Sequence, residues 1–238
     1  MIYFAHRGAS HYAPENTAGA LALALEMGAK AVELDVHLTA DGVVVVHHDY
    51  ELKRTAGAEV RIEDEVFDEL KKYNLAEHFK AWKKPEHILS LEEALKLLGG
   101  RTLVNVEIKN DGGLYPSMEP AVLHACLRRF KKTLFSSFDH ETLLRLRGLE
   151  PKARIGVLVN GVDFDAAFTT AEEVKAESLH LALRKLDGRV VNTAHEMGLK
   201  VYVYTVDSVA AASLAQAVGA DGVFTNRPDL EKEMKELK

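Results

Sequence analysis

The chain has 238 residues, of which 47% are hydrophobic, and its formal net charge is −6. This length suits one barrel-type domain, and we expect residues 1–238 to form a single domain. The negative charge argues against nucleic-acid binding, because nonspecific binding depends on Lys and Arg side chains that neutralise phosphates. Cys126 is the only cysteine, which excludes an internal disulfide and a thiolate metal site.

The sequence predicts no transmembrane segment, because no run of about 18 apolar residues occurs in it. Residues 1–7 are too short an apolar run for a secretory signal, and the charged Arg7 ends it, so we interpret them as a strand. We therefore expect a cytoplasmic protein. No pattern in the sequence indicates an oligomeric state.

Short β-rich runs alternate with longer helical patterns along the chain. The expected strands are 2–5, 31–37, 102–108, 133–138, 154–159, 178–181, 200–206 and 222–225. The expected helices are 17–27, 91–98, 119–129, 140–146, 166–174, 187–197, 209–218 and 230–237. Such strand-then-helix units predict an α/β protein with a closed parallel (β/α)8 TIM barrel rather than an open doubly wound sheet. The absence of a dinucleotide-type glycine fingerprint after the first strand also weakens the open-sheet alternative.

Residues that favour helix ends support this division. Asn16 is placed where an N-cap would lie, and Gly28 and Gly198 directly follow expected helices. Ser90 is followed three residues later by Glu93, which is the spacing of a capping box.

The second strand is expected to continue into a hairpin. Asp41-Gly42 lies between two β-rich runs, and this dipeptide is a strong hairpin signal. A two-residue turn there would place Asp35 opposite His48, with their Cβ atoms about 4.5–5.5 Å apart. Residues 50–89 would then form a small insertion, too long for a plain loop, with short helices that cap the C-terminal face of the barrel.

Polar residues cluster at the C-terminal ends of the first three strands and of the hairpin. In a barrel these ends build the active site, whatever the reaction. Alternate residues of a strand share one face, so each strand presents its polar residues together. The candidate residues are His6, Arg7, Glu33, Asp35, His48, Glu107 and Lys109.

The three carboxylates of this set indicate a metal site. Glu33, Asp35 and Glu107 would repel one another in one cavity, and a divalent cation would remove that repulsion. Oxygen ligands alone favour Mg²⁺ or Ca²⁺ over zinc, and we expect one such ion. The alternative is that the acids only form salt bridges with Arg7 and Lys109.

The remaining residues of the set suit phosphoryl chemistry. His6 and His48 can act as a base and an acid near neutral pH. Arg7 and Lys109 supply the positive charge that holds a phosphoryl group. Three other histidines near strand ends are interpreted as structural: His37, His47 and His180.

Several segments resemble the glycerophosphodiester phosphodiesterase family, and they occur in family order along nearly the whole chain. They are His6-Arg7-Gly8-Ala9-Ser10, Pro14-Glu15-Asn16-Thr17, Glu33-Leu34-Asp35-Val36, Asp41-Gly42 through Val45-Val46-His47-His48-Asp49, Asn105-Val106-Glu107-Ile108-Lys109, Ser136-Ser137-Phe138 and Gly219 to Pro228. The resemblance implies a TIM-type barrel that hydrolyses a small glycerophosphodiester to sn-glycerol 3-phosphate and an alcohol.

The resemblance also implies roles for single residues. Glu33, Asp35 and Glu107 match the family's metal ligands, His6 and His48 its acid/base pair, and Arg7 and Lys109 its phosphate contacts. Residues 50–89 correspond to the family's insertion. Four positions depart from the family's pattern. Tyr204 replaces a tryptophan and Asp207 an asparagine, and Asn226 replaces a frequent aspartate and His37 a common glutamine. Tyr204 and Phe138 are expected to form a wall beside the substrate.

Three questions stay open at this point. By resemblance to the related phosphoinositide-cleaving barrels, His6 is expected to be the base and His48 the acid. The nucleophile is either water or the glycerol 2-hydroxyl, which would pass through a cyclic phosphate. Two alternative functions remain, a lysophospholipase D that uses the same site on lysophospholipids, and an inactive barrel that only binds phosphodiesters or a partner.

Overall fold

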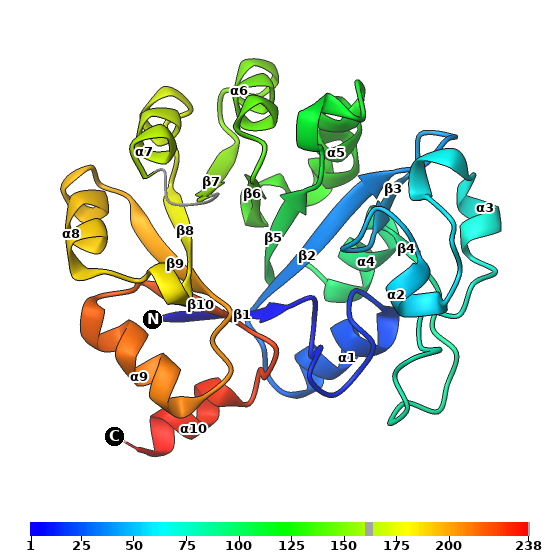
Figure 1. Ribbon diagram of the computed structural model, residues 1–238, viewed down its shortest axis with the longest axis horizontal. Helices are drawn as coiled ribbons and strands as arrows, with labels where there is room; N and C mark the ends of the chain where they lie inside the picture. The colour runs from blue at the N-terminus through cyan, green and yellow to red at the C-terminus, as the bar shows by residue number, and fades with distance from the viewer. Residues whose placement is uncertain (160–163, 238) are drawn as a thin grey trace.

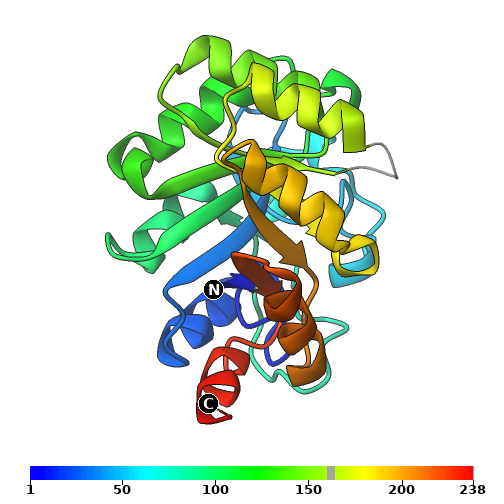
Figure 2. The same cartoon turned by 90° about the vertical axis from the view of Figure 1, so that its left-hand side faces the viewer.

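The computed structural model describes residues 1–159 and 164–237. Within these residues, eight parallel strands close into a barrel, because β1 pairs with both β2 and β10 (Figure 1). The barrel strands are β1 (Ile2–His6), β2 (Ala31–Leu38), β5 (Leu103–Ile108), β6 (Thr133–Ser137), β7 (Arg154–Leu158), β8 (Ser178–Ala182), β9 (Lys200–Tyr204) and β10 (Gly222–Thr225). Figure 2 shows the N-terminus beside β10, where the first and last strands meet.

Helices surround the strands and follow them in sequence (Figure 1). The α-helices of this outer layer are α1 (Ala18–Glu26), α4 (Leu91–Leu98), α5 (Met118–Cys126), α6 (His140–Leu149), α7 (Phe164–Glu173), α8 (Gly188–Glu196), α9 (Val209–Val218) and α10 (Leu230–Glu236). Short 3₁₀ turns are η2 (Asp111–Gly113), η3 (Leu127–Lys132) and η4 (Leu183–Lys185). Each strand and helix expected from the sequence corresponds to an element of the same type, which confirms the (β/α)8 barrel.

The alternation of side chains along the strands creates two apolar layers and one polar cavity. Val32 and Leu34 of β2 point outward and are buried among the helices. Inside the barrel, an aromatic cluster that includes Phe4 and Phe224 fills the lower part, with these two rings 4.9 Å apart. Burying one such large side chain stabilises the fold by roughly 1.5–3 kcal/mol. Above this cluster the inward positions become polar, and Glu33 is the first of them on β2.

The N-terminus of α1 differs from the prediction. Thr17, not Asn16, is the N-cap, and its hydroxyl accepts a hydrogen bond from the Ala20 backbone amide. Asn16 has a φ of 58° and donates a hydrogen bond from its side chain to Asp35 at 2.9 Å. The Asn16 side chain thus binds Asp35 inside the barrel, and the neighbouring Thr17 caps the helix.

The other predicted helix ends are confirmed. Gly28 and Gly198 follow the C-caps of α1 and α8 with φ values of 87° and 76°, where glycine avoids the strain of a side chain. Ser90 and Glu93 form the complete capping box of α4.

The hairpin is present, but its predicted register was wrong by one residue. β3 (Val44–Val46) pairs antiparallel to β2 with Val36 opposite Val46, so His47 lies opposite Asp35. The loop contains three residues rather than two, since the Val43 carbonyl accepts from the Thr39 amide. Gly42 has a φ of 79°, as in a three-residue hairpin loop that ends in a left-handed glycine. His48 follows the paired segment and is free to turn toward the barrel.

The insertion after β3 has short helices, as predicted, and a small core of its own. Its elements are α2 (Lys53–Ala56), η1 (Ile62–Asp64), α3 (Phe67–Leu70) and β4 (Leu89–Ser90), and β4 pairs with β3. The core consists of Val45, Leu52, Ile62, Leu70, Leu75 and Ile88. The insertion lies on the outer side of β2 (Figure 1). It reaches the loops at the C-terminal end of the barrel through a hydrogen bond from Tyr50 to Asp111 and an ion pair of Arg54 with Glu15.

Among the described residues, no helix has the length and apolar character needed to cross a membrane.

Candidate functional site

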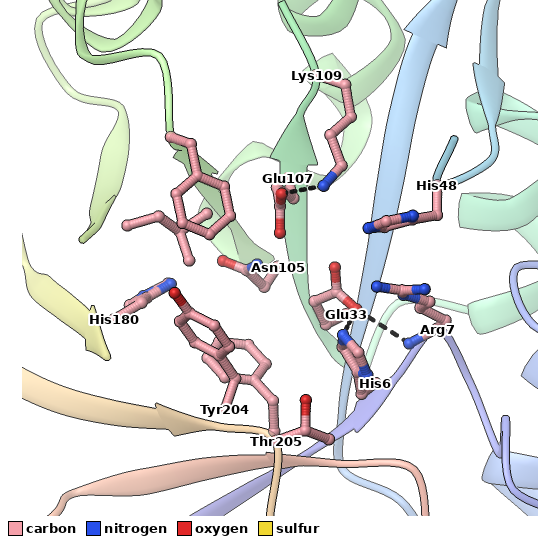
Figure 3. A pocket seen from close by; sticks show the side chains of 13 residues that line it. His6, Arg7, Glu33, His48, Asn105, Glu107, Lys109, His180, Tyr204 and Thr205 are labelled. Carbon is pink, nitrogen blue, oxygen red and sulfur yellow. Dashed lines mark hydrogen bonds and ion pairs between the residues drawn. The ribbon is translucent and has the colours of Figure 1, made fainter. Parts of the chain in front are cut away.

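A cavity of about 220 Å³ opens at the C-terminal end of the barrel. Its lining consists of His6, Arg7, Glu33, His48, Asn105, Glu107, Lys109, Phe138, Leu158, His180, Tyr204, Thr205 and Phe224. Figure 3 shows the charged side chains on one side of the cavity, with His180 and Tyr204 facing them. The lining comes from strand ends, the loops that follow them and His48 of the hairpin. No residue of the insertion, 50–89, is among them, so the cap predicted over the C-terminal face does not form a wall of this cavity.

Three buried carboxylates lie together at this cavity. The strand register explains their proximity, because β2 and β5 are neighbours and Asp35 pairs with Glu107. Glu33 is two residues before Asp35 and therefore lies on the same face. One oxygen from each of the three carboxylates lies within 4.8 Å of the others. These three oxygens form an arrangement that can hold a single cation.

Two cations compensate only part of this negative charge. Arg7 Nε lies 3.3 Å from one oxygen of Asp35, and Lys109 Nζ lies 3.1 Å from the other and also pairs with Glu107. Although burial opposes ionisation, Lys109 and Arg7 hold the pKa of Asp35 well below its usual range. Burial and the charges of Asp35 and Glu107 raise the pKa of Glu33.

The hydrogen bonds of the Glu33 carboxylate show whether a metal would fit beside it. Its Oε2 accepts from the Arg7 backbone amide at 3.0 Å, whereas its Oε1 is buried and has no hydrogen-bond partner among the described residues. A buried carboxylate oxygen without a donor is costly. An oxygen-coordinated divalent cation between Glu33, Asp35 and Glu107 would supply both the missing partner and the missing charge.

His6 is held in one defined tautomer. Its Nδ1 lies 2.7 Å from Asn226 Oδ1, and the Asn226 amide nitrogen donates to Asp207 at 2.7 Å. Because a carboxylate only accepts, the Asn226 oxygen must face His6 and accept the Nδ1 proton. Nε2 then carries the lone pair, and it lies 3.9 Å from Glu33. Burial, assisted by the charge of Arg7, lowers the pKa of His6 to about 4.

His48 enters the cavity from the hairpin and makes a different contact. Its Nδ1 lies 2.6 Å from Asp49 Oδ1, and the other oxygen of Asp49 accepts from Arg54 at 2.7 Å. These hydrogen bonds from His48 and Arg54 overcome the effect of burial and lower the pKa of Asp49. Asp49 thus holds His48 by Nδ1 through a carboxylate, whereas an amide oxygen holds His6.

The two aromatic residues expected beside the substrate also line the cavity. The rings of Phe138 and Tyr204 meet edge to face with centroids 6.1 Å apart. Leu158 completes this apolar side. The cavity thus has a charged wall and an apolar wall.

The three histidines interpreted as structural differ in their hydrogen bonds. His37 contacts Tyr115 and the His48 carbonyl, and His47 contacts the Asp49 carbonyl and Thr55, so both rings use both nitrogens on protein partners. His180 is fully buried but lines the cavity, and its Nδ1 has no hydrogen-bond partner among the described residues.

Burial of His180 predicts a pH-dependent loss of stability. Desolvation lowers its pKa to about 3, whereas the unfolded chain binds this proton near pH 6.5. As pH falls below about 6.5 the unfolded state gains a proton that the folded state lacks, so stability decreases by up to about 1.4 kcal/mol per pH unit. Urea unfolding at pH 7.5 and pH 5 should show a smaller loss for His180→Phe than for wild type. Equal losses would contradict the buried, neutral state.

The sequence did not identify several residues that support the site. Glu15 bridges Arg7 and Arg54, and its pKa of about 2 reflects these guanidinium groups, which outweigh its burial. Asn16 was interpreted only as a helix cap, although it donates to Asp35. Asn226 and Asp207 follow the last strands of the barrel, where the rule that strand ends build the site could have found them.

Similarity to known proteins extends along the chain. The model of the Glycerophosphoryl diester phosphodiesterase family matches residues 6–230. A glycerophosphodiester phosphodiesterase of Caldanaerobacter subterraneus is 33% identical over 96% of this chain and 95% of its own length. A phosphodiesterase of Oleispira antarctica, solved with its product sn-glycerol-3-phosphate, has a TM-score of 0.89 and 28% identity, with 99% of this chain and 97% of that chain covered.

A second solved structure is similar to this chain over nearly its whole length. The glycerophosphodiester phosphodiesterase of Thermotoga maritima has a TM-score of 0.82 and 29% identity, and the match covers 98% of both chains. Because the family model spans nearly the whole sequence and the relatives match from end to end, the chain belongs to the glycerophosphoryl diester phosphodiesterase family.

Proposed function

We propose that this protein is a metal-dependent enzyme that hydrolyses glycerophosphodiesters to sn-glycerol 3-phosphate and an alcohol. The observation that carries the proposal is the cluster at the cavity, where three neighbouring carboxylates lie beside two histidines and two cations. Similarity to the Oleispira antarctica phosphodiesterase, solved with that product, supports the substrate class. A cytoplasmic location, one domain over residues 1–238 and the lack of nucleic-acid binding remain predictions.

Glu33, Asp35 and Glu107 would hold the metal, and their oxygen-only donor set favours Mg²⁺ or Ca²⁺. When bound, such an ion supplies positive charge that polarises a phosphoryl oxygen and stabilises charge in the transition state. Arg7 and Lys109 line the same cavity and can donate to the remaining phosphoryl oxygens.

The two histidines take opposite parts in proton transfer. His6 is neutral, with Nε2 unprotonated, so it removes the proton from the attacking hydroxyl group. His48 lines the same cavity and its Nδ1 is held by Asp49, so it is placed as the acid that protonates the leaving alkoxide. The same assignment holds whether the attacking group is water or the glycerol 2-hydroxyl. A cyclic glycerophosphate, trapped during turnover and detected by ³¹P NMR, would identify the second route.

The Asn226 contact predicts a loss of activity without a loss of substrate binding. Asn226→Leu removes the acceptor that fixes the His6 tautomer, and we expect kcat to fall about 10–100-fold with KM little changed. Steady-state kinetics on glycerophosphocholine measures both constants. Ser10→Ala is the control, because it removes the hydrogen bonds of the Ser10 hydroxyl to the Asn226 oxygen and to the His6 carbonyl but keeps the acceptor for His6 Nδ1. Equal losses in the two variants would contradict this role of Asn226.

The substrate class is tested by comparing two diesters that share the glycerophosphocholine core. We expect glycerophosphocholine to be hydrolysed with a much higher kcat/KM than lysophosphatidylcholine, measured below the latter's micelle concentration. The cavity is small and one of its walls is charged, which does not favour an acyl chain. Preference for lysophosphatidylcholine would instead identify a lysophospholipase D, and hydrolysis of neither would indicate an inactive barrel.

A further inference from the structure

Two buried polar side chains at the cavity have atoms that no part of the described chain satisfies. Asn105 is 1% exposed and donates to the Ser136 hydroxyl at 2.9 Å, but its Oδ1 has no hydrogen-bond partner. His180 is fully buried, with Nε2 2.9 Å from the Ser178 hydroxyl and Nδ1 without a partner. Both residues line the cavity, and Figure 3 shows Asn105 between His180 and the charged side chains, with its oxygen directed toward the side of His180.

No neighbouring group explains why Asn105 Oδ1 and His180 Nδ1 are polar, because neither atom has a hydrogen-bond partner among the described residues. The His180 ring packs against the aromatic rings of Tyr202 and Phe224, with centroid distances of 5.4 and 5.1 Å, and these rings offer its Nδ1 no hydrogen-bond partner. A buried polar atom without a partner destabilises the folded chain, and apolar replacement removes that cost. Retaining two such atoms at one cavity is therefore best explained by a ligand that satisfies them.

The chemistry of the two atoms indicates which group they bind. Neither side chain brings charge, since Asn105 is an amide and burial keeps His180 neutral by lowering its pKa to about 3. The amide oxygen accepts a hydrogen bond, and a neutral imidazole nitrogen either donates or accepts one. A hydroxyl group can donate and accept, so it matches both. A phosphate would instead favour the wall formed by Arg7 and Lys109.

We propose that Asn105 and His180 form the floor of the site and bind the terminal hydroxyl of the glycerol moiety, which makes them specificity-determining residues. This inference rests on the proposed function. With its phosphate at Arg7 and Lys109, the substrate directs its far end away from the charged wall and toward this floor. Diesters that lack the terminal hydroxyl leave both floor atoms buried and unpaired, and the enzyme discriminates against them.

The test compares glycerophosphocholine with its analogue built on propane-1,2-diol, which lacks only the terminal hydroxyl. Wild type should show a kcat/KM about 10²-fold lower on the analogue, because a site built to bond a hydroxyl rejects a ligand without it. Asn105→Leu and His180→Phe should reduce that ratio to about threefold by slowing the natural substrate more than the analogue. Ser136→Ala and Ser178→Ala are matched controls that keep the cavity-facing atoms, and they should retain the wild-type ratio.

Stability separates ligand recognition from a structural role. Without substrate at pH 7.5, His180→Phe should be destabilised less than Ser178→Ala, since both remove the hydrogen bond between the two side chains but only His180→Phe also removes an unsatisfied atom. If Asn105→Leu does not fold, as judged by circular dichroism, Asn105→Ser makes the same comparison of rates.

The outcomes distinguish this inference from the proposed function. If wild type hydrolyses both diesters equally well, or both floor variants keep the wild-type ratio, the floor does not recognise the hydroxyl, although the phosphodiesterase activity stands. If His180→Phe is destabilised as strongly as Ser178→Ala and keeps the ratio, His180 is structural. If wild type hydrolyses neither diester with metal present, the proposed function fails and this inference fails with it.

Discussion

Alanine in place of His6 or His48 should lower kcat on glycerophosphocholine by about 10²–10⁴-fold, because each substitution removes one partner of the proton transfer. Neither side chain is part of an apolar core cluster, so circular dichroism and the unfolding midpoint should change little. His124→Ala is the matched control, since His124 is exposed on α5. Wild-type rates in both His6→Ala and His48→Ala would show that the acid/base assignment is wrong.

A second substrate separates the base from the acid. When p-nitrophenol is the leaving group it departs without protonation, so the glycerophospho-p-nitrophenyl diester should restore much of the activity of His48→Ala. The same diester should not rescue His6→Ala, because removal of the nucleophile's proton is still required. The reverse pattern of rescue would exchange the two roles.

Removal of divalent metal should have the other large effect. With excess chelator we expect hydrolysis to stop, and Mg²⁺ or Ca²⁺ to restore it, because Glu33, Asp35 and Glu107 retain uncompensated negative charge without a cation. Metal that binds only the folded state should also stabilise it, by about 2.7 kcal/mol at a concentration 100 times the Kd. Thermal unfolding with and without metal measures this shift.

Variants distinguish a metal site from a set of salt bridges. Glu107→Gln should lose both the activity and the metal-dependent rise in Tm. Glu177→Gln is the control, because Glu177 also contacts two cations, Arg154 and Lys200, and precedes β8 at the N-terminal end of the barrel. If the acids only neutralise Arg7 and Lys109, chelator will change neither the rate nor the Tm of wild type.

The barrel could be predicted because its determinants are local. Each strand is a short β-rich run and each helix an amphipathic or apolar segment, and their strict alternation permits few topologies. The hairpin register could not be predicted in the same way. Asp41-Gly42 indicates a turn but is compatible with loops of two or three residues, and one additional residue places His47 instead of His48 opposite Asp35.

The site was predictable to the extent that strand periodicity determines it. Glu33 and Asp35 alternate on one strand and Glu107 lies on its neighbour, so a parallel register brings them together. The contact of His6 with Asn226 joins residues 220 positions apart, and no local pattern indicates it. The unpaired nitrogen of His180 is likewise a property of the folded barrel, because only the structure shows which of its contacts are absent among the described residues.

The central claim is that Glu33, Asp35 and Glu107 hold a metal that this chain needs to hydrolyse a glycerophosphodiester. The most direct measurement is ³¹P NMR of glycerophosphocholine incubated with the purified protein in Mg²⁺, in Ca²⁺ and in excess chelator. We expect the diester signal to be replaced by that of sn-glycerol 3-phosphate in at least one metal and to persist in chelator. Equal hydrolysis in chelator, or an unchanged diester in both metals, would contradict it.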